Sequence, residues 1–200
     1  MGVTDYFEAP PELLPCLPEL LADIWALGSS PEIVVEWLRS LQLPPEATQI
    51  LDLGCGKGAV SVNLAKELGF KIKGIDFFEP FLVEAREKAR KLGVEGLSSF
   101  ECADMLDILK ESSDYDIVIY TGVGGLLGSF DQCVLRLRQT VRPGGYMVID
   151  DGFRVTSDEI SRSGYDHYTY YQETIRQLTP HGDIILRENI VPVEDIKSRH

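Results

Sequence analysis

The chain has 200 residues, the length of one domain or of one domain with a small helical appendage. A composition of 44% hydrophobic and 26% charged residues is typical of globular proteins and excludes a disordered or collagen-like chain. The 19 Lys and Arg against 32 Asp and Glu give a net charge of −13, which repels phosphate backbones. Nucleic acid is therefore not expected as a partner.

The cysteines and the apolar runs bound the class of protein further. The four cysteines form no CxxC pair, which excludes a zinc ribbon or zinc finger and favours a reducing compartment. No apolar stretch approaches the roughly 18 residues of a membrane span. The N-terminus is acidic and broken by prolines, unlike a signal peptide. We therefore expect a soluble, cytoplasmic protein that does not bind membranes, as a monomer or homodimer.

Residues 1–45 differ from the rest of the chain because prolines punctuate them repeatedly. Within this segment the sequence predicts a helix over Pro31–Leu41 with Ser30 as its cap. The segment is too short to carry a core of its own. We expect a helical N-terminal cap that packs against the sheet edge or over a site, in the same domain as residues 46–200.

From residue 48 onward, short apolar runs alternate with helical periodicity, which is typical of an α/β domain. Amphipathic helices are predicted near residues 59–68, 80–92 and 130–141. The fold class we expect is a doubly wound, mostly parallel, Rossmann-like sheet with helices on both faces. The predicted strands are Gln49–Leu53, Lys71–Ile75, Leu97–Glu101, Tyr115–Tyr120 and Tyr146–Asp150, with a sixth at Asp183–Val191. No seventh strand is predicted, so the domain could lack its last strand.

The segment Ile50–Gly58 carries the clearest chemical signal. A strand runs into three alternating glycines, Gly54, Gly56 and Gly58, and a helix follows. Glycines are needed where the backbone turns sharply and a ligand approaches it closely. The dinucleotide fingerprint G-x-G-x-x-G/A also fits, but Asp52 lies where it would repel a pyrophosphate and attract an ammonium group.

The segment LDLGCGKG resembles motif I of the class I S-adenosylmethionine-dependent methyltransferases, and the following segments match that family's order. The resemblance runs from about residue 47 to 153. It implies that Asp76, after the second strand, binds both ribose hydroxyls of S-adenosylmethionine, and that Asp104 and Met105 meet the adenine. The cofactor-binding residues so predicted are Asp52, Gly54, Cys55, Gly56, Asp76, Phe77, Asp104, Met105 and Thr121.

Several of these residues have a structural alternative. Asp76 could be an exposed carboxylate at a strand end, and Asp104 could be only the N-cap of the next helix. Phe77 and Phe78 follow Asp76, and we expect one to pack on the adenine and the other on the core.

The residues that would receive the methyl group are less distinct. The Asn-Pro-Pro-Tyr type of motif is absent after the fourth strand. Asp150 and Asp151 suggest a metal site, but Thr121 stands where a further carboxylate would be needed, so no metal is predicted. His167, within an aromatic segment, is a candidate general base because histidine titrates near neutral pH. Its alternative is a helix that buries alternate tyrosines and leaves His167 facing solvent.

Taken together, the sequence predicts an S-adenosylmethionine-dependent methyltransferase acting on a small molecule. One alternative is a catalytically silent module of the same fold that binds the cofactor as a regulator or partner subunit. A nicotinamide-dinucleotide dehydrogenase is a remote alternative, because the chain has no Tyr-x-x-x-Lys pair among the tyrosines that follow the fifth strand.

Overall fold

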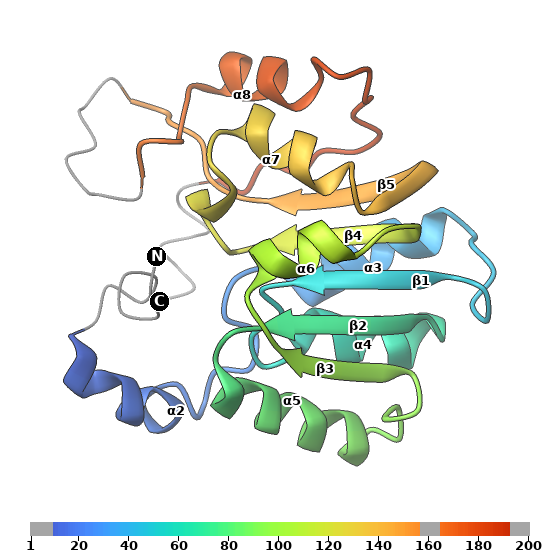
Figure 1. The fold of residues 1–200 in the computed structure, drawn as a ribbon, viewed down its shortest axis with the longest axis vertical. Coiled ribbons are helices and arrows are strands. Elements are labelled where there is room, and N and C mark those ends of the chain that lie inside the picture. Colours follow the sequence, from blue (N-terminus) through green and yellow to red (C-terminus); the bar gives the residue numbers. More distant parts are fainter. Residues whose placement is uncertain (1–9, 157–164, 193–200) are drawn as a thin grey trace.

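A five-stranded parallel sheet organises the computed structural model, which describes residues 10–156 and 165–192 (Figure 1). The strand order is β3-β2-β1-β4-β5. The chain adds β2 and β3 on one side of β1 and then returns to add β4 and β5 on the other side, so the strand order reverses between β1 and β4. The carboxyl ends of parallel strands share one edge, and in Figure 1 all arrowheads point to the side where α2 lies. The strands are β1 (Gln49–Leu53), β2 (Lys71–Asp76), β3 (Ser98–Cys102), β4 (Tyr115–Thr121) and β5 (Val141–Asp150).

Helices cover both faces of this sheet, which confirms the predicted fold class. No helix of the described ranges is long and apolar enough to cross a membrane. The helical elements are η1 (Pro11–Cys16), α2 (Leu17–Leu20), α3 (Pro31–Ser40), α4 (Ala59–Leu68), α5 (Glu79–Lys91), α6 (Met105–Glu111), η2 (Gly125–Leu127), α7 (Phe130–Leu137) and α8 (Tyr171–Leu178).

Successive side chains of a strand point to opposite faces of the sheet, so each face of the sheet buries alternate residues of each strand. In β1, Ile50 packs with α3 and α4, whereas Leu51 and Leu53 pack with α6 and α7. All three side chains are fully buried. Asp52 lies between Leu51 and Leu53 in sequence, and its side chain points to the same face as Ile50, toward α4. A carboxylate is therefore buried on a face of the sheet that is otherwise apolar at β1.

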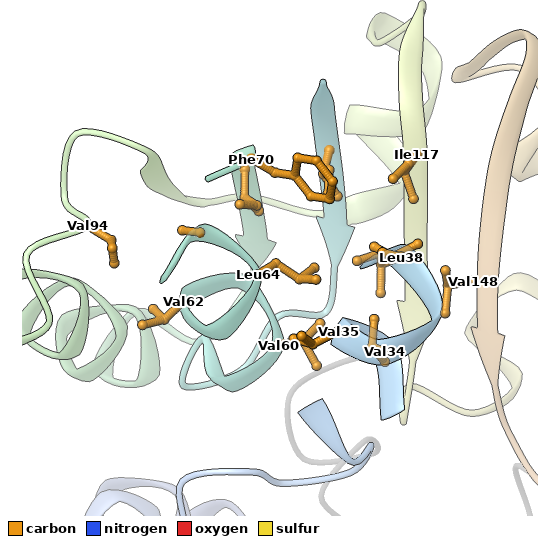
Figure 2. Packing of buried hydrophobic residues seen from close by; sticks show 14 of the residues in the cluster. Val34, Val35, Leu38, Val60, Val62, Leu64, Phe70, Val94, Ile117 and Val148 are labelled. Carbon is orange, nitrogen blue, oxygen red and sulfur yellow. The ribbon is translucent and has the colours of Figure 1, made fainter. Parts of the chain in front are cut away.

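The N-terminal segment contributes to this core. Figure 2 shows Val34, Val35 and Leu38 of α3 beside residues of α4 and of the sheet. Pro31 begins α3, where its missing N–H costs nothing, and Ser30 donates to Glu32 rather than capping the helix. Helix α3 therefore contributes buried side chains to the same core cluster as α4 and the sheet.

Two predictions about the C-terminal half are wrong. The helix predicted to reach Val141 ends at Leu137, and β5 begins at Val141 and includes Pro143. Pro143 is tolerated because β5 is an edge strand, and its register against β4 shifts between Tyr115 and Ile117. The predicted sixth strand, Asp183–Val191, has no strand structure, and Ile184 in it is 77% exposed.

Candidate functional site

An open cavity of about 1230 Å³ lies at the carboxyl edge of the sheet. Ligands collect at this edge in doubly wound sheets, where the strand order reverses. Segments from the whole length of the chain line it: the N-terminal residues 21–29, the glycine-rich loop after β1, the end of β2, the loop after β4, and the segment after β5. All the predicted cofactor-binding residues except Asp104 are in the lining, and so is His167.

The backbone of the glycine-rich loop is tied to the end of β2. The N–H groups of Gly54 and Cys55 both donate to the carbonyl of Ile75, at 2.8 and 3.0 Å. The N–H of Gly56 donates to Asp76 Oδ2 at 2.8 Å. A site for a pyrophosphate needs such N–H groups to point at the ligand. These three N–H groups are already bonded to β2 and do not point at a ligand.

The glycines are required partly by packing inside the protein. Gly54 and Gly58 both have left-handed backbone conformations, with φ of 72° and 71°. A Cβ at Gly54 would lie 2.5 Å from a methyl of Val123, and a Cβ at Gly58 would lie 2.8 Å from Ala85. The loop is therefore shaped by its contacts with the loop after β4 and with α5 as well as by its opening to the cavity.

Asp76 ends β2 with its side chain 8% exposed at the cavity wall. Besides the bond from Gly56, its Oδ1 accepts from the N–H of Phe78 at 2.9 Å. Burial raises the pKa of this carboxyl, and the bonds from Phe78 and Gly56 oppose that rise. The alternative of an exposed strand-end carboxylate is wrong, because Asp76 is buried and holds the glycine-rich loop.

Asp52 lies deeper, with 1% of its surface exposed. Its Oδ2 accepts a hydrogen bond from Ser61 Oγ of α4 at 2.5 Å. Burial raises its pKa from the usual 3.8 to about 6, and the nearby charge of Asp76 adds to the rise. Asp52 and Asp76 together make the wall beside the glycine-rich loop negative. Between them the thiol of Cys55 is a weak nucleophile, because burial raises its pKa well above the usual value.

The two phenylalanines after Asp76 are both half-buried, and the predicted adenine contact of one of them stays a prediction. Phe77 lines the cavity, and Phe78 packs edge-on against Phe81 of α5 with ring centroids 4.8 Å apart. Met105 and Thr121 also line the cavity. Asp104 lies outside the lining and is exposed, and its Oδ1 accepts from the N–H of Leu106 at 2.8 Å as the N-cap of α6. Asp104 is therefore the N-cap of α6, and its predicted contact with the adenine stays a prediction.

Lys57, inside the glycine-rich loop, is a residue that the sequence reasoning missed. Its side chain is 1% exposed, and Nζ donates to the carbonyl of Leu21 at 2.7 Å and lies 2.9 Å from Glu84 Oε2. Its carbonyl in turn accepts from the indole N–H of Trp25 at 2.9 Å. A lysine between two glycines was a visible signal, but Leu21 and Trp25 come from a segment more than thirty residues earlier, and Glu84 comes from α5.

These bonds fasten the N-terminal segment over the glycine-rich loop. A second attachment lies at the loop after β4, where a Cβ on Gly28 would lie 3.0 Å from the Cα of Gly122. The sequence predicts that the N-terminal segment packs against the sheet edge or over a site. Trp25 of this segment lines the cavity.

At the other side of the cavity, the segment after β5 forms a polar cluster. His167 Nε2 lies 3.2 Å from Asp151 Oδ2, and Tyr168 Oη donates to Asp151 Oδ1 at 2.8 Å. Residues 165–170 form a turn and an isolated bridge instead of a helix. The side chain of His167 is 7% exposed. The alternative in which His167 faces solvent from a helix is therefore wrong.

The acidic pair at the end of β5 separates. Asp150 is exposed, whereas Asp151 turns into the cavity. Within the described part of the chain, no three His, Cys, Asp or Glu side chains gather as they would around a metal ion.

Comparisons with known proteins agree with this geometry. The sequence is 29% identical over 114 residues to the methyltransferase GfsG of Streptomyces halstedii, covering 56% of this chain and 41% of that protein. It is 30% identical over 118 residues to a ubiquinone biosynthesis O-methyltransferase of Rickettsia prowazekii, covering 59% of this chain and 45% of that protein. The chain thus spans less than half the length of these curated relatives.

The fold is similar to a solved structure of a SAM-dependent methyltransferase from Thiobacillus denitrificans in complex with S-adenosyl-L-homocysteine. The TM-score is 0.69 at 21% sequence identity, over 80% of this chain and 67% of that one. At this identity the likeness supports the fold alone. The sequence model of a family described as "Methyltransferase domain" matches residues 45–189, which contain the five strands of the sheet and the residues after β5 that line the cavity. The chain therefore belongs to this family of methyltransferase domains.

Proposed function

We propose that this chain binds S-adenosylmethionine in the cavity at the carboxyl edge of the sheet and transfers its methyl group to a small molecule. The observation that carries the proposal is the position of Asp76. Its buried carboxylate lines the cavity beside the glycine-rich loop and accepts one backbone N–H on each oxygen. A carboxylate has about four lone-pair sites. Asp76 therefore keeps acceptor capacity for the hydroxyls of a ribose.

The charge of the cavity wall supports the same cofactor. Asp52 and Asp76 stand beside the glycine-rich loop, whose N–H groups at Gly54, Cys55 and Gly56 are bonded to β2. Such a wall favours a ligand with a positive charge over one with phosphates. S-adenosylmethionine carries a sulfonium and an ammonium group, and when bound it supplies an activated methyl group.

The size and lining of the cavity leave room for an acceptor. About 1230 Å³ exceeds the ≈ 300–1,000 Å³ of ordinary ligand pockets. Phe77 and Met105 offer apolar surface for an adenine near Asp76, and Thr121 lies between this side and Asp151. The protein's part in the transfer is to hold the two reactants in line, because the sulfonium is its own leaving group.

The domain organisation and the cellular location of the protein are proposed as well. We propose that the N-terminal segment and residues 46–200 form one domain, supported by the packing of α3 in the core. A cytoplasmic location is supported by the separated cysteines, which are free in the structure. We also propose that the protein is a monomer or a homodimer.

Calorimetric titration with S-adenosylmethionine and with S-adenosylhomocysteine tests the proposal. The wild type should bind both, and Asp76→Ala should weaken binding about 100-fold or more, since each hydrogen bond to a charged group contributes about 1.5–3 kcal/mol. Asp107→Ala is the matched control, because Asp107 is an exposed carboxylate paired with Lys110 outside the cavity lining. Thermal melts of both variants separate lost binding from lost folding. A folded wild type that binds neither ligand would refute the proposal.

A further inference from the structure

The N-terminal segment brings a buried hydroxyl group to the wall of the cavity. Ser29 is 8% exposed and lines the cavity, and its Oγ is buried with no hydrogen-bond partner among the described residues. Such groups are rare in folded proteins, because a buried hydroxyl without a partner has lost its hydrogen bonds to water and gained none in return. At the wall of a cavity, an unpaired hydroxyl indicates a ligand group that pairs with it.

Contacts on both sides of Ser29 fix the backbone that carries this hydroxyl. Before it, the indole N–H of Trp25 donates to a carbonyl of the glycine-rich loop at 2.9 Å. A Cβ on Gly28 would lie 3.0 Å from the Cα of Gly122, and a Cβ on Gly122 would lie 3.7 Å from the backbone nitrogen of Ser29. After it, α3 begins within two residues and packs in the core. Ser29 is therefore held beside the loop after β4, and rotation about its Cα–Cβ bond is enough to turn the hydroxyl.

The strand order determines which end of the cofactor reaches Ser29. Under the proposed function the ribose lies at Asp76, which ends β2, and the adenine lies beside Met105, which follows β3. Ser29 lies on the opposite side, at the loop after β4, and β1 stands between β2 and β4. Two strand spacings amount to about 10 Å. With the adenine toward β3, the amino-acid arm of the cofactor extends from the ribose across β1 toward Ser29.

The charges of the cavity leave the carboxylate of that arm in need of a donor. The arm ends in an ammonium group, which the carboxylate of Asp52 attracts, and in an α-carboxylate, which the negative wall repels. Lys57 lines the cavity, but its ammonium group is bonded to Glu84 and to the carbonyl of Leu21. The first three N–H groups of the glycine-rich loop are bonded to β2. The hydroxyl of Ser29 is not engaged by any described residue.

We propose that the hydroxyl of Ser29 donates a hydrogen bond to the α-carboxylate of the bound cofactor. This inference rests on the proposed function. It makes Ser29 a cofactor-binding residue of the N-terminal segment, whereas every binding residue predicted from the sequence lies at Asp52 or later. The segment then recognises the amino-acid arm as well as covering the glycine-rich loop.

Calorimetric titration with two ligands that differ in this arm tests the proposal. S-adenosylhomocysteine carries the whole arm, whereas 5′-deoxy-5′-methylthioadenosine keeps the adenine, ribose and sulfur and has a methyl group in place of the arm. Ser29→Ala should weaken binding of S-adenosylhomocysteine by about 10–100-fold, the usual contribution of a hydrogen bond to a charged group, and leave binding of methylthioadenosine unchanged. Unchanged affinity for S-adenosylhomocysteine, or an equal loss for both ligands, would overturn the proposal.

A second buried hydroxyl supplies the matched control. Ser98 of β3 is also 8% exposed, and its Oγ likewise has no hydrogen-bond partner among the described residues, but Ser98 lies outside the cavity lining. Ser98→Ala should bind both ligands as the wild type does. If it weakens binding of S-adenosylhomocysteine as much as Ser29→Ala does, the effect does not come from a contact with the ligand and the proposal is wrong.

Thermal melts without ligand give a readout that is independent of binding. Ser29→Ala should not lower the melting temperature, because it removes a buried polar group that has no partner in the folded protein. A lower melting temperature would show that the hydroxyl is already paired inside the protein, and would refute the proposal. The proposed function fails separately, because in that case the folded wild type binds neither ligand.

Discussion

Asp52 is a carboxylate built into the hydrophobic layer between β1 and α4, and replacing it should change how stability depends on pH. Asp52 is 1% exposed, and its carboxylate accepts a hydrogen bond from the hydroxyl of Ser61. Asp52→Asn keeps an oxygen that accepts this hydrogen bond and removes the ionisation. The variant therefore isolates the free energy of burying the charge.

The magnitude follows from the pKa of Asp52, which burial raises from 3.8 to about 6. The folded state holds the proton to a higher pH than the unfolded state, so the stabilisation is fully present below pH 3.8 and is lost as the pH rises through about 6. At about 1.4 kcal/mol per pKa unit, the complete loss is about 3 kcal/mol, of which about 2 kcal/mol falls between pH ~4.5 and ~7.5.

Urea unfolding of both proteins at these two pH values measures the effect. The free energy of unfolding of Asp52→Asn minus that of the wild type should increase by about 2 kcal/mol from the lower pH to the higher. Asp107→Asn, which alters an exposed carboxylate, should give a much flatter difference and serves as the control. A difference for Asp52→Asn that does not change with pH would show that the buried carboxylate costs nothing when ionised, and would refute this reasoning.

Two further substitutions test the elements around the cavity. Lys57→Met leaves the carbonyl of Leu21 and the carboxylate of Glu84 without their buried partner; we expect a loss of about 1–3 kcal/mol in unfolding free energy and faster hydrogen exchange in residues 21–29. Unchanged exchange there would mean that Lys57 does not fasten the N-terminal segment. Asp104→Ala removes the N-cap of α6 and should lower stability by about 1 kcal/mol with unchanged affinity for S-adenosylmethionine. If calorimetry instead shows weaker binding, the adenine contact predicted from the sequence is correct.

The sequence by itself determined the parts of the fold that depend on local pattern. β1 has the predicted bounds, Gln49–Leu53, because a buried strand flanked by polar residues and followed by glycines can be read without its neighbours. The residues predicted to bind the cofactor follow from the resemblance of the glycine-rich segment and the later segments to the family motifs, and all of them except Asp104 line one cavity. Asp76 and the glycines of the loop lie within short segments after consecutive strands, and the carboxyl ends of parallel strands meet at one edge.

Only the tertiary structure decided the features that depend on a distant partner. Asp183–Val191 has the composition of a strand, but a strand requires another strand to bond with, and none pairs with it in the described residues. Lys57 is buried because Leu21 and Glu84 surround its charge, and His167 meets Asp151 because the chain turns back over β5. Buried charges are stable only with such partners, and sequence spacing does not reveal which residues the fold brings together.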